Sequence, residues 1–178
     1  FVCFTARDEA YSAHRPKYQH APMSHRNSDI QTYLPAIEAL VQRGYAGLRM
    51  GAEVAKPLVS RNPAIIDYAT IAWSDFLDIF LGAHCRFYLG DGAGLHNVPI
   101  IFRRPVALVN FIPMEYTTTW NPRDLFIPKT LWLRSERRLM TFQEMLTSGA
   151  SRWQRDYEYA QYGLEVINST PEEITAVA

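Results

Sequence analysis

Short runs of apolar residues alternate with amphipathic segments along the first two thirds of the chain. Runs rich in β-forming residues lie at 1–6, 46–50, 86–89 and 105–111, and a shorter run at 65–68 predicts a short strand or turn. Between them, apolar positions at helical spacing predict helices over 30–41 and 74–83. Strands and helices that alternate in this way form parallel sheets with crossover helices. The pattern therefore predicts an α/β fold, a Rossmann-like parallel sheet with flanking helices.

Residues with known preferences mark the ends of these helices. Ser28, with Gln31 three residues later, fits a capping box at the start of the first helix. Ser74 fits an N-cap for the second helix, and Asn97 fits an N-cap for a short helix that ends near residue 103. Gly44 is a suitable stop for the first helix.

The last third of the chain has a weaker pattern. A short extended piece is expected at 125–128, a capped helix at 141–146, and a helix start at 169–173. We expect one domain over 1–146 and an extension over 147–178 that packs on it. The chain begins inside an apparent core strand and stops soon after a helix start. These features predict the back half of a larger protein with a truncated extension.

Length and charge limit the possible functions. The chain has 178 residues, enough for one α/β domain with a real core. Its 18 Lys and Arg residues balance 18 Asp and Glu residues, so no global field attracts nucleic acid or an anionic membrane. Phosphate binding therefore requires a local cluster. The sequence contains no apolar run long enough to span a membrane and no pattern of cysteines typical of a disulfide framework. We expect Cys3 and Cys85 to be buried free thiols, as in a cytoplasmic protein.

A glycine-rich loop follows the strand at 86–89. It reads Gly90-Asp91-Gly92-Ala93-Gly94, and Leu95, His96 and Asn97 lead from it into the next helix. Glycine lets the backbone approach a ligand closely, and a helix N-terminus offers unpaired amides to an anion. The spacing differs from the dinucleotide fingerprint and from the P-loop. It predicts a phosphate-binding loop, with a tight turn that binds no ligand as the alternative.

Charged residues follow the ends of several expected strands. Arg7, Asp8 and Arg49 come directly after or at the ends of strands, Arg26 precedes a helix, and Glu115 follows the strand at 105–111. In open α/β sheets, ligands bind beyond the carboxyl ends of the strands. Arginine side chains bind phosphate oxygens through paired donors, and a carboxylate can accept hydrogen bonds from a ribose. The alternative is a solvated surface charge at each position.

Other kinds of catalytic site have little support. The five histidines are His14, His20, His25, His84 and His96, and their spacing fits no metal site. His96 adjoins the glycine loop, where it could contact a phosphate or leaving group. The sequence contains no Gly-x-Ser-x-Gly nucleophile elbow. The aromatic residues lack an accompanying basic stripe, which favours core packing or sugar stacking over RNA binding.

Several segments together resemble a known family. They are 26–30 with 33–37, 49–51, 74–79, 94–99 and 110–113, which read RNSDI, YLPAI, RMG, SDFLDI, GLHNVP and NFIP. This set resembles a family of predicted bacterial glycosyltransferases from surface-polysaccharide loci, and the resemblance covers about residues 1–146. The residues around Arg7 and the segment 87–103 are also distantly similar to fucosyltransferases and heptosyltransferases.

The resemblance implies one half of a GT-B fold, the C-terminal half that binds a nucleotide-sugar donor. It implies metal-independent transfer of a sugar to a glycan or lipid-linked acceptor, with a separate N-terminal acceptor domain that normally supplies the catalytic base. By analogy, Arg7, Arg26 and Asp8 are catalytic candidates, and the first two stabilise the leaving diphosphate. Donor-binding candidates are Arg49, Gly90, Gly92, Ala93, Gly94, Leu95, His96, Asn97 and Glu115, the last as the ribose contact. The expected location is the cytoplasm, with peripheral contact to the inner membrane face as an option.

Two other functions fit the same scaffold. A nucleotide-sugar epimerase would need acid and base residues within this half, and Asp8, Asp67 and His96 are the candidates. A non-catalytic module that binds a nucleotide or sugar would need only the binding groups. Fold analogy alone does not separate these functions.

Overall fold

The computed structural model describes residues 1–13, 23–118 and 120–178. The strands are β1 (Val2–Thr5), β2 (Gly47–Arg49), β3 (Ile65–Ile66), β4 (Tyr88–Gly90), β5 (Val106–Phe111), β6 (Leu125–Pro128), β7 (Thr130–Leu133), β8 (Arg138–Leu139) and β9 (Leu164–Ile167). The α-helices are α1 (Ala10–Ala13), α3 (Leu34–Gln42), α4 (Tyr68–Ile71), α5 (Asp75–His84), α6 (Asn97–Ile101), α7 (Phe142–Thr147), α8 (Asp156–Gln161) and α9 (Pro171–Val177). Short 3₁₀ helices are η1 (Ser24–Arg26), η2 (Ile30–Tyr33), η3 (Gly94–His96), η4 (Met114–Tyr116) and η5 (Ala150–Arg152).

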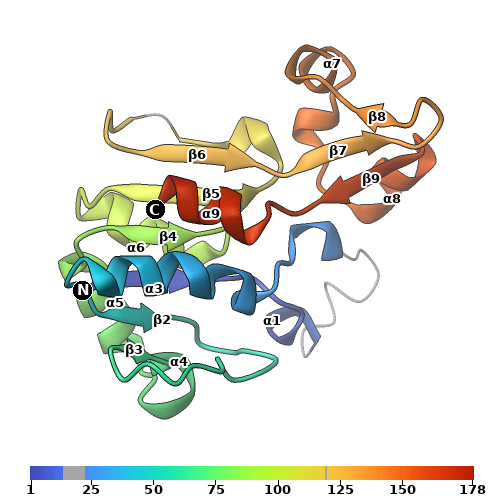
Figure 1. The fold of residues 1–178 in the computed structure, drawn as a ribbon. Coiled ribbons are helices and arrows are strands. Elements are labelled where there is room, and N and C mark those ends of the chain that lie inside the picture. Colours follow the sequence, from blue (N-terminus) through green and yellow to red (C-terminus); the bar gives the residue numbers. More distant parts are fainter. Residues whose placement is uncertain (14–22, 119) are drawn as a thin grey trace.

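The main sheet has six parallel strands in the order β3-β2-β1-β4-β5-β6 (Figure 1). This arrangement confirms the predicted α/β, Rossmann-like class. The chain moves outward in one direction from β1 to β3, then returns to the other side of β1 with β4. The two central strands pair in parallel from Cys3↔Tyr88 to Thr5↔Gly90. In such sheets, the reversal of strand order opens a crevice beyond the carboxyl ends of the two central strands.

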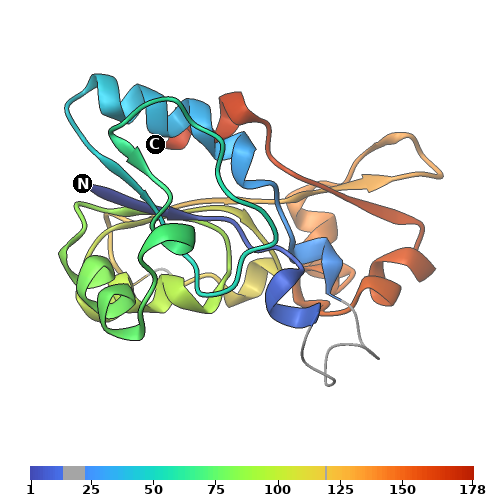
Figure 2. The same ribbon diagram turned by 90° about the horizontal axis from the view of Figure 1, so that it is seen from below.

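Each face of the sheet has its own hydrophobic core, because successive side chains of a strand point to opposite faces. Val2 and Phe4 pack with residues of α3 and with Ile174 of α9, whereas Cys3 lies in the core that includes residues beside α5 and α6. Figure 2 shows α3 and α9 on one side of the sheet and α5 and α6 on the other. The sheet is therefore covered on both faces, which holds the carboxyl ends of its strands in fixed positions.

A second, antiparallel sheet with the order β8-β7-β9 extends from the end of β6 (Figure 1). Its core, around Leu131, Met145 and Tyr159, is separate from the two cores of the main sheet. After β9 the chain returns to the main sheet, where the Ser169 amide donates to Asn110 Oδ1 at 2.6 Å. The expected boundary between 146 and 147 falls at the end of α7, among residues that pack on the second sheet.

Two of the predicted helix caps are wrong. Ser28 does not cap the first helix, because its buried hydroxyl donates to Asp91; Asp29 accepts the Gln31 amide at 3.0 Å instead. Asn97 is not an N-cap, since the 3₁₀ turn η3 begins three residues earlier and Asn97 Nδ2 donates back to the Gly94 carbonyl. For Ser28 a contact with a distant residue replaces the cap, and for Asn97 the preceding 3₁₀ turn does.

Helix α5 begins at the predicted cap, where Ser74 Oγ accepts the Leu77 amide at 3.3 Å. Its Phe76, Ile79 and Phe80 are exposed, whereas Leu77 and Leu81 pack toward the sheet. The sequence pattern predicts Phe76, Ile79, Phe80 and Ala83 as one apolar face; of these four, Ala83 alone is buried, so the predicted face is mostly wrong.

Cys3 and Cys85 are buried free thiols, as predicted. In the described part of the chain, no helix is long and apolar enough to span a membrane.

Candidate functional site

A cavity of about 530 Å³ opens where the strand order reverses. Segments that follow three neighbouring strands line it, together with Met23 and Arg26 at the two ends of η1 and one residue of α5. The lining residues are Thr5, Ala6, Arg7, Asp8, Met23, Arg26, Gly51, Ala52, Glu53, Val54, Asp78, Gly92, Ala93, Gly94, Leu95, His96 and Asn97. The structure therefore brings Arg7, Asp8, Arg26 and most of the predicted glycine loop to one cavity.

The glycines of the loop have different roles. A Cβ at Gly90 would lie 2.8 Å from the Thr5 carbonyl oxygen, so glycine permits the close approach of β1 and β4. A Cβ at Gly92 would lie 3.1 Å from the Phe111 ring. At Gly94, a Cβ would meet no described atom within 4 Å. The first two glycines shape the loop, and the third leaves open space in the cavity.

The loop also presents backbone donors. The amides of Gly94 and Leu95 open the turn of η3 and donate to no acceptor in the described part of the chain. The first amides of a helical turn have no acceptor within the turn, and they favour an anion. Gly94 and Leu95 line the same cavity as Arg7 and Arg26.

The buried side chain of Asp91 connects the glycine loop to two other segments. It is fully buried and accepts hydrogen bonds from the Arg7 amide at 2.6 Å and from Ser28 Oγ at 2.8 Å. Burial raises the pKa of Asp91, and the hydrogen bonds from Arg7 and Ser28 oppose that effect. This carboxyl group connects the end of β1, the loop after β4 and the segment before η2, so it fixes the relative positions of the groups that line the cavity.

The two arginines of the cavity are held in defined orientations. Arg7 Nη1 donates to the Met23 carbonyl at 3.0 Å and to Asn27 Oδ1 at 2.6 Å. Arg26 Nη2 donates to the Gly92 carbonyl at 2.7 Å, and its Nε is buried without an acceptor among the described residues. These hydrogen bonds fix the direction in which each guanidinium group points, and Arg26 Nε is a donor that a ligand could still use.

Two residues from distant parts of the chain support the turn that carries Arg26. Lys129, buried between β6 and β7, donates to the carbonyls of His25 at 2.7 Å and Asn27 at 2.6 Å. Burial lowers the pKa of Lys129 to about 8; Asp91 opposes this and Arg7 contributes to it. The position of Arg26 therefore depends on a buried cation far along the sequence.

Asp156 in α8 supports the same turn from the second sheet. Its carboxylate accepts from the Ser24 amide at 2.9 Å, from Ser24 Oγ at 2.6 Å and from the His25 amide at 3.0 Å, and it pairs with His25 Nδ1. Burial raises the pKa of Asp156, but the hydrogen bonds from His25 and Ser24 outweigh it and bring the pKa to about 2. The carboxylate is thus ionised at neutral pH.

His96 occupies the start of the helical segment after the loop. Its Nδ1 faces the Ala93 carbonyl oxygen, a contact that requires the proton on Nδ1. Burial lowers the pKa of His96, so the neutral ring predominates at neutral pH. In this tautomer, Nε2 has a lone pair that can accept a hydrogen bond from a ligand hydroxyl.

Three acids, Asp8, Glu53 and Asp78, line the cavity, and the two aspartates differ in how many of their oxygens already accept hydrogen bonds. Asp8 Oδ1 accepts the Ala10 amide at 2.9 Å and Oδ2 accepts the Ala55 amide at 2.8 Å, so both oxygens hold backbone in place. Asp78 accepts from Trp73 Nε1 at 3.0 Å through Oδ2, while its buried Oδ1 has no partner among the described residues. Burial raises the pKa of Asp78. Asp78 is therefore the more available acceptor.

Arg49 and Glu115 do not line this cavity. Arg49 is buried, and its guanidinium donates to Asp67 at 2.9 Å and to the Lys56 carbonyl at 3.3 Å. Glu115 accepts from Ser151 Oγ at 2.6 Å and pairs with Arg152, so it connects η4 to η5. In this structure both side chains support the fold rather than the cavity.

Lys129, Asp156 and Asp78 were not predicted as site residues. Asp78 and Lys129 stand as single charges within apolar segments, at 76–80 and 125–133, and such a charge is a signal for a buried polar contact. Asp156 carries no comparable signal, because its partners lie over 100 residues earlier in the chain. His14 and His20, considered as metal ligands, lie outside the described residues.

Comparisons of the chain with protein-family models, curated protein sequences and solved structures gave no match. Inference about function therefore rests on the fold and on the geometry of the cavity.

Proposed function

We propose that this chain is the donor-binding part of a glycosyltransferase that uses a nucleotide-sugar donor without a metal ion. One observation carries the proposal. Arg7, Arg26 and the free amides of Gly94 and Leu95 line one cavity at the point where strand order reverses. This combination of paired guanidinium donors and helix-start amides suits a diphosphate.

In the proposed reaction, an acceptor hydroxyl attacks the anomeric carbon of the sugar. The bond between that carbon and the phosphate oxygen breaks, and its electron pair remains on the departing diphosphate. The hydroxyl proton passes to a base. Arg7, Arg26 and the loop amides stabilise the charge that develops on the diphosphate, and their fixed orientations reduce the reorganisation needed during the reaction.

Other side chains of the cavity are assigned roles according to whether they can still accept a hydrogen bond. His96 Nε2 and Asp78 Oδ1 are suited to accept hydrogen bonds from donor hydroxyl groups. Asp8 is unsuited to act as the base, because both of its oxygens accept backbone amides. We therefore assign the base and the glycan or lipid-linked acceptor to a second GT-B domain, and the reaction to the cytoplasm, as the family resemblance implies.

Calorimetric titration of the chain with UDP, GDP, CMP and NAD, each with and without Mg²⁺, tests this proposal. We expect one nucleoside diphosphate to bind without metal. Gly94→Val should abolish that binding, because the new side chain fills the cavity without clashing with the described structure. Ala72→Val adds similar bulk at an exposed position outside the cavity and serves as the matched control. Arg7→Ala should weaken binding, and Arg61→Ala, also at an exposed position outside the cavity, should not.

Other outcomes would indicate other functions. Binding of NAD in place of a nucleoside diphosphate would indicate an oxidoreductase, and failure of a folded chain to bind any of the nucleotides would overturn the proposal. A nucleotide-sugar epimerase is less well supported, because Asp67, like Asp8, has both oxygens engaged, by Arg49, the Leu58 amide and Thr70.

A further inference from the structure

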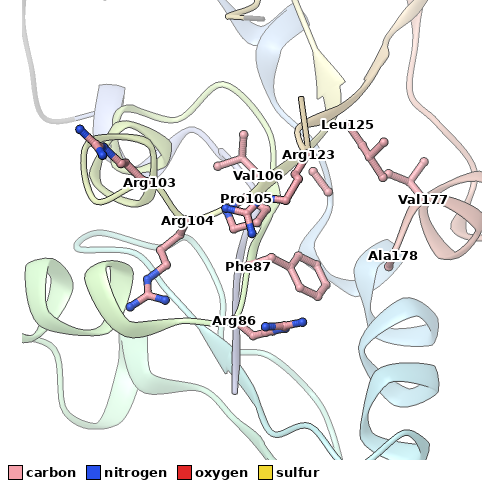
Figure 3. A pocket seen from close by; sticks show the side chains of 11 residues that line it. Arg86, Phe87, Arg103, Arg104, Pro105, Val106, Arg123, Leu125, Val177 and Ala178 are labelled. Atoms are coloured by element: carbon pink, nitrogen blue, oxygen red, sulfur yellow. The ribbon is translucent and has the colours of Figure 1, made fainter. Parts of the chain in front are cut away.

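The opposite edge of the main sheet, at the amino ends of its strands, carries a cluster of arginines. Arg86 precedes β4, Arg103 and Arg104 precede β5, and Arg123 precedes β6. They surround a hollow of about 290 Å³ whose other lining residues include Phe87, Pro105, Val106, Leu125, Val177 and Ala178 (Figure 3). The described side chains that line this hollow are therefore arginine or apolar, without a carboxylate side chain.

These arginines do not converge on one point. In Figure 3, Arg103 and Arg104 point away from Phe87, whereas the side chain of Arg86 lies beside the Phe87 ring. Arg104 Nε donates to the Ala83 carbonyl at 2.7 Å, whereas the exposed side chains of Arg86, Arg103 and Arg123 make no hydrogen bond or ion pair within the described residues. A spread of exposed cations suits an extended anionic surface better than a single phosphate.

Exposed apolar side chains surround the same arginines. A second hollow, of about 430 Å³, is lined by Arg103, Arg104 and Arg123 together with Ile101 and Trp120. Asp124 also lines it, and its Oδ1 accepts the Val106 amide at 3.0 Å, so the three arginines still outnumber the one carboxylate. Ile101 is 72% exposed and Trp120 is 79% exposed, and Phe102 and Leu125 are also exposed. Tryptophan and large apolar side chains beside arginine are typical of surfaces that lie at a membrane interface.

We propose that this edge of the molecule docks on an anionic lipid membrane. The arginines would contact lipid phosphates, and Ile101, Phe102 and Trp120 would enter the region between headgroups and acyl chains. The whole chain has balanced charge, so attraction to lipid depends on this local cluster. Nucleic acid is the other extended polyanion, but exposed isoleucine and leucine side chains gain little from a phosphate backbone, which favours lipid.

This inference is independent of the proposed donor site. The arginine cluster lies at the amino ends of the strands, and the donor cavity lies at their carboxyl ends. A docked molecule would therefore present the cavity away from the lipid surface. Loss of membrane binding would leave nucleotide binding intact, and the reverse also holds, so the two proposals can fail separately.

Vesicle flotation tests the proposal with the purified chain. One set of vesicles contains phosphatidylcholine alone, and the other contains equal parts of phosphatidylcholine and phosphatidylglycerol. We expect binding only to the second set, with affinity that falls as salt increases. Arg103→Glu/Arg123→Glu should weaken binding by about tenfold or more. The control, Arg134→Glu/Arg137→Glu, makes the same charge change at exposed positions in the β7–β8 turn and should retain binding.

Tryptophan fluorescence provides a second readout. Anionic vesicles should shift the emission to shorter wavelength, and Trp120→Phe should remove most of that shift while the folded chain retains its circular dichroism spectrum. Equal loss of binding in the control pair would overturn the proposal, as would equal binding to both vesicle types or no binding at all. Binding of a short DNA duplex that depends on Arg103 and Arg123, without vesicle binding, would assign the surface to nucleic acid instead.

Discussion

The two edges of the main sheet use arginine in different ways. At the carboxyl edge, Arg7 and Arg26 are fixed by hydrogen bonds to Met23, Asn27 and Gly92. At the amino edge, Arg86, Arg103 and Arg123 are exposed and make no such bonds within the described residues. A fixed guanidinium can match the geometry of one ligand, because its orientation does not have to be established on binding. An exposed guanidinium without such bonds can adapt to an irregular anionic surface.

The difference lies in what surrounds the arginines. Asp91, Lys129 and Asp156 together fix the segments that carry the carboxyl-edge pair. Of the four arginines at the amino edge, Arg104 donates a side-chain hydrogen bond to another described residue, at the Ala83 carbonyl. We therefore expect ligand binding at the carboxyl edge to depend sharply on the geometry of the arginine side chains. At the amino edge, we expect binding to depend mainly on their charge.

The largest expected effect comes from removing the buried carboxyl group. Asp91→Ala should lower the free energy of unfolding by about 3 kcal/mol, because it removes the side-chain acceptor of the Arg7 amide and of the Ser28 hydroxyl, and one of the carboxyl groups that favour charged Lys129. Urea denaturation measures this loss, and Asp75→Ala at the exposed start of α5 is the control. If the two variants were equally stable, Asp91 would not be the residue that fixes the carboxyl edge.

Next in size is a pH effect from Lys129. The folded chain releases the Lys129 proton near pH 8, whereas the unfolded chain retains it up to the ordinary pKa of 10.5. Between these values the unfolded state binds more protons, so the contribution of Lys129 to the free energy of unfolding should rise with pH. Urea titrations of the wild type and Lys129→Met on both sides of pH 8 measure it. A difference between the two proteins that does not change with pH would contradict the assignment.

A smaller effect is expected from a change of shape without a change of charge. Arg7→Lys should lower affinity for the nucleoside diphosphate by about tenfold, because lysine cannot reproduce the paired donors of a guanidinium. Calorimetry measures it, with Arg61→Lys as the control. Unchanged affinity would show that Arg7 acts only through its charge.

The smallest effect is expected from the same substitution at the other edge. Arg103→Lys/Arg123→Lys should leave binding to phosphatidylglycerol vesicles within about twofold of the wild type, because attraction to anionic lipid depends mainly on charge. Flotation measures this against Arg103→Glu/Arg123→Glu. A loss as large in the lysine pair as in the glutamate pair would remove the contrast between the edges.

The parallel sheet could be predicted because its strands are short apolar runs separated by helical patterns, which are local signals. The second sheet was not predicted, since β7 pairs with β9 more than 30 residues later, from Thr130↔Ile167 to Leu133↔Leu164, and neither strand has a strong local pattern. The extended piece at 125–128 was recognised, but its continuation into an antiparallel sheet depends on contacts that the local sequence does not encode.

The cavity could be predicted in part for a related reason. Arg7 and the glycine loop follow strands that proved to be neighbours, so a rule about the carboxyl ends of parallel strands brought them together. The same rule placed Arg49 there, although its guanidinium turns inward to Asp67. The rule locates a residue along its strand, whereas the direction of a long side chain depends on partners elsewhere in the chain.

The contacts of Asp156 have a consequence for how the two sheets respond to each other. Asp156 of α8 holds the turn that carries Arg26. Any motion that separates the second sheet from the main sheet would therefore also move the Arg26 guanidinium away from the cavity. Thermodynamic reciprocity then requires a ligand that needs Arg26 to favour the closed association of the two sheets. Ligand binding in the cavity should thus slow proteolysis and hydrogen exchange in the second sheet, at β7, β8 and β9.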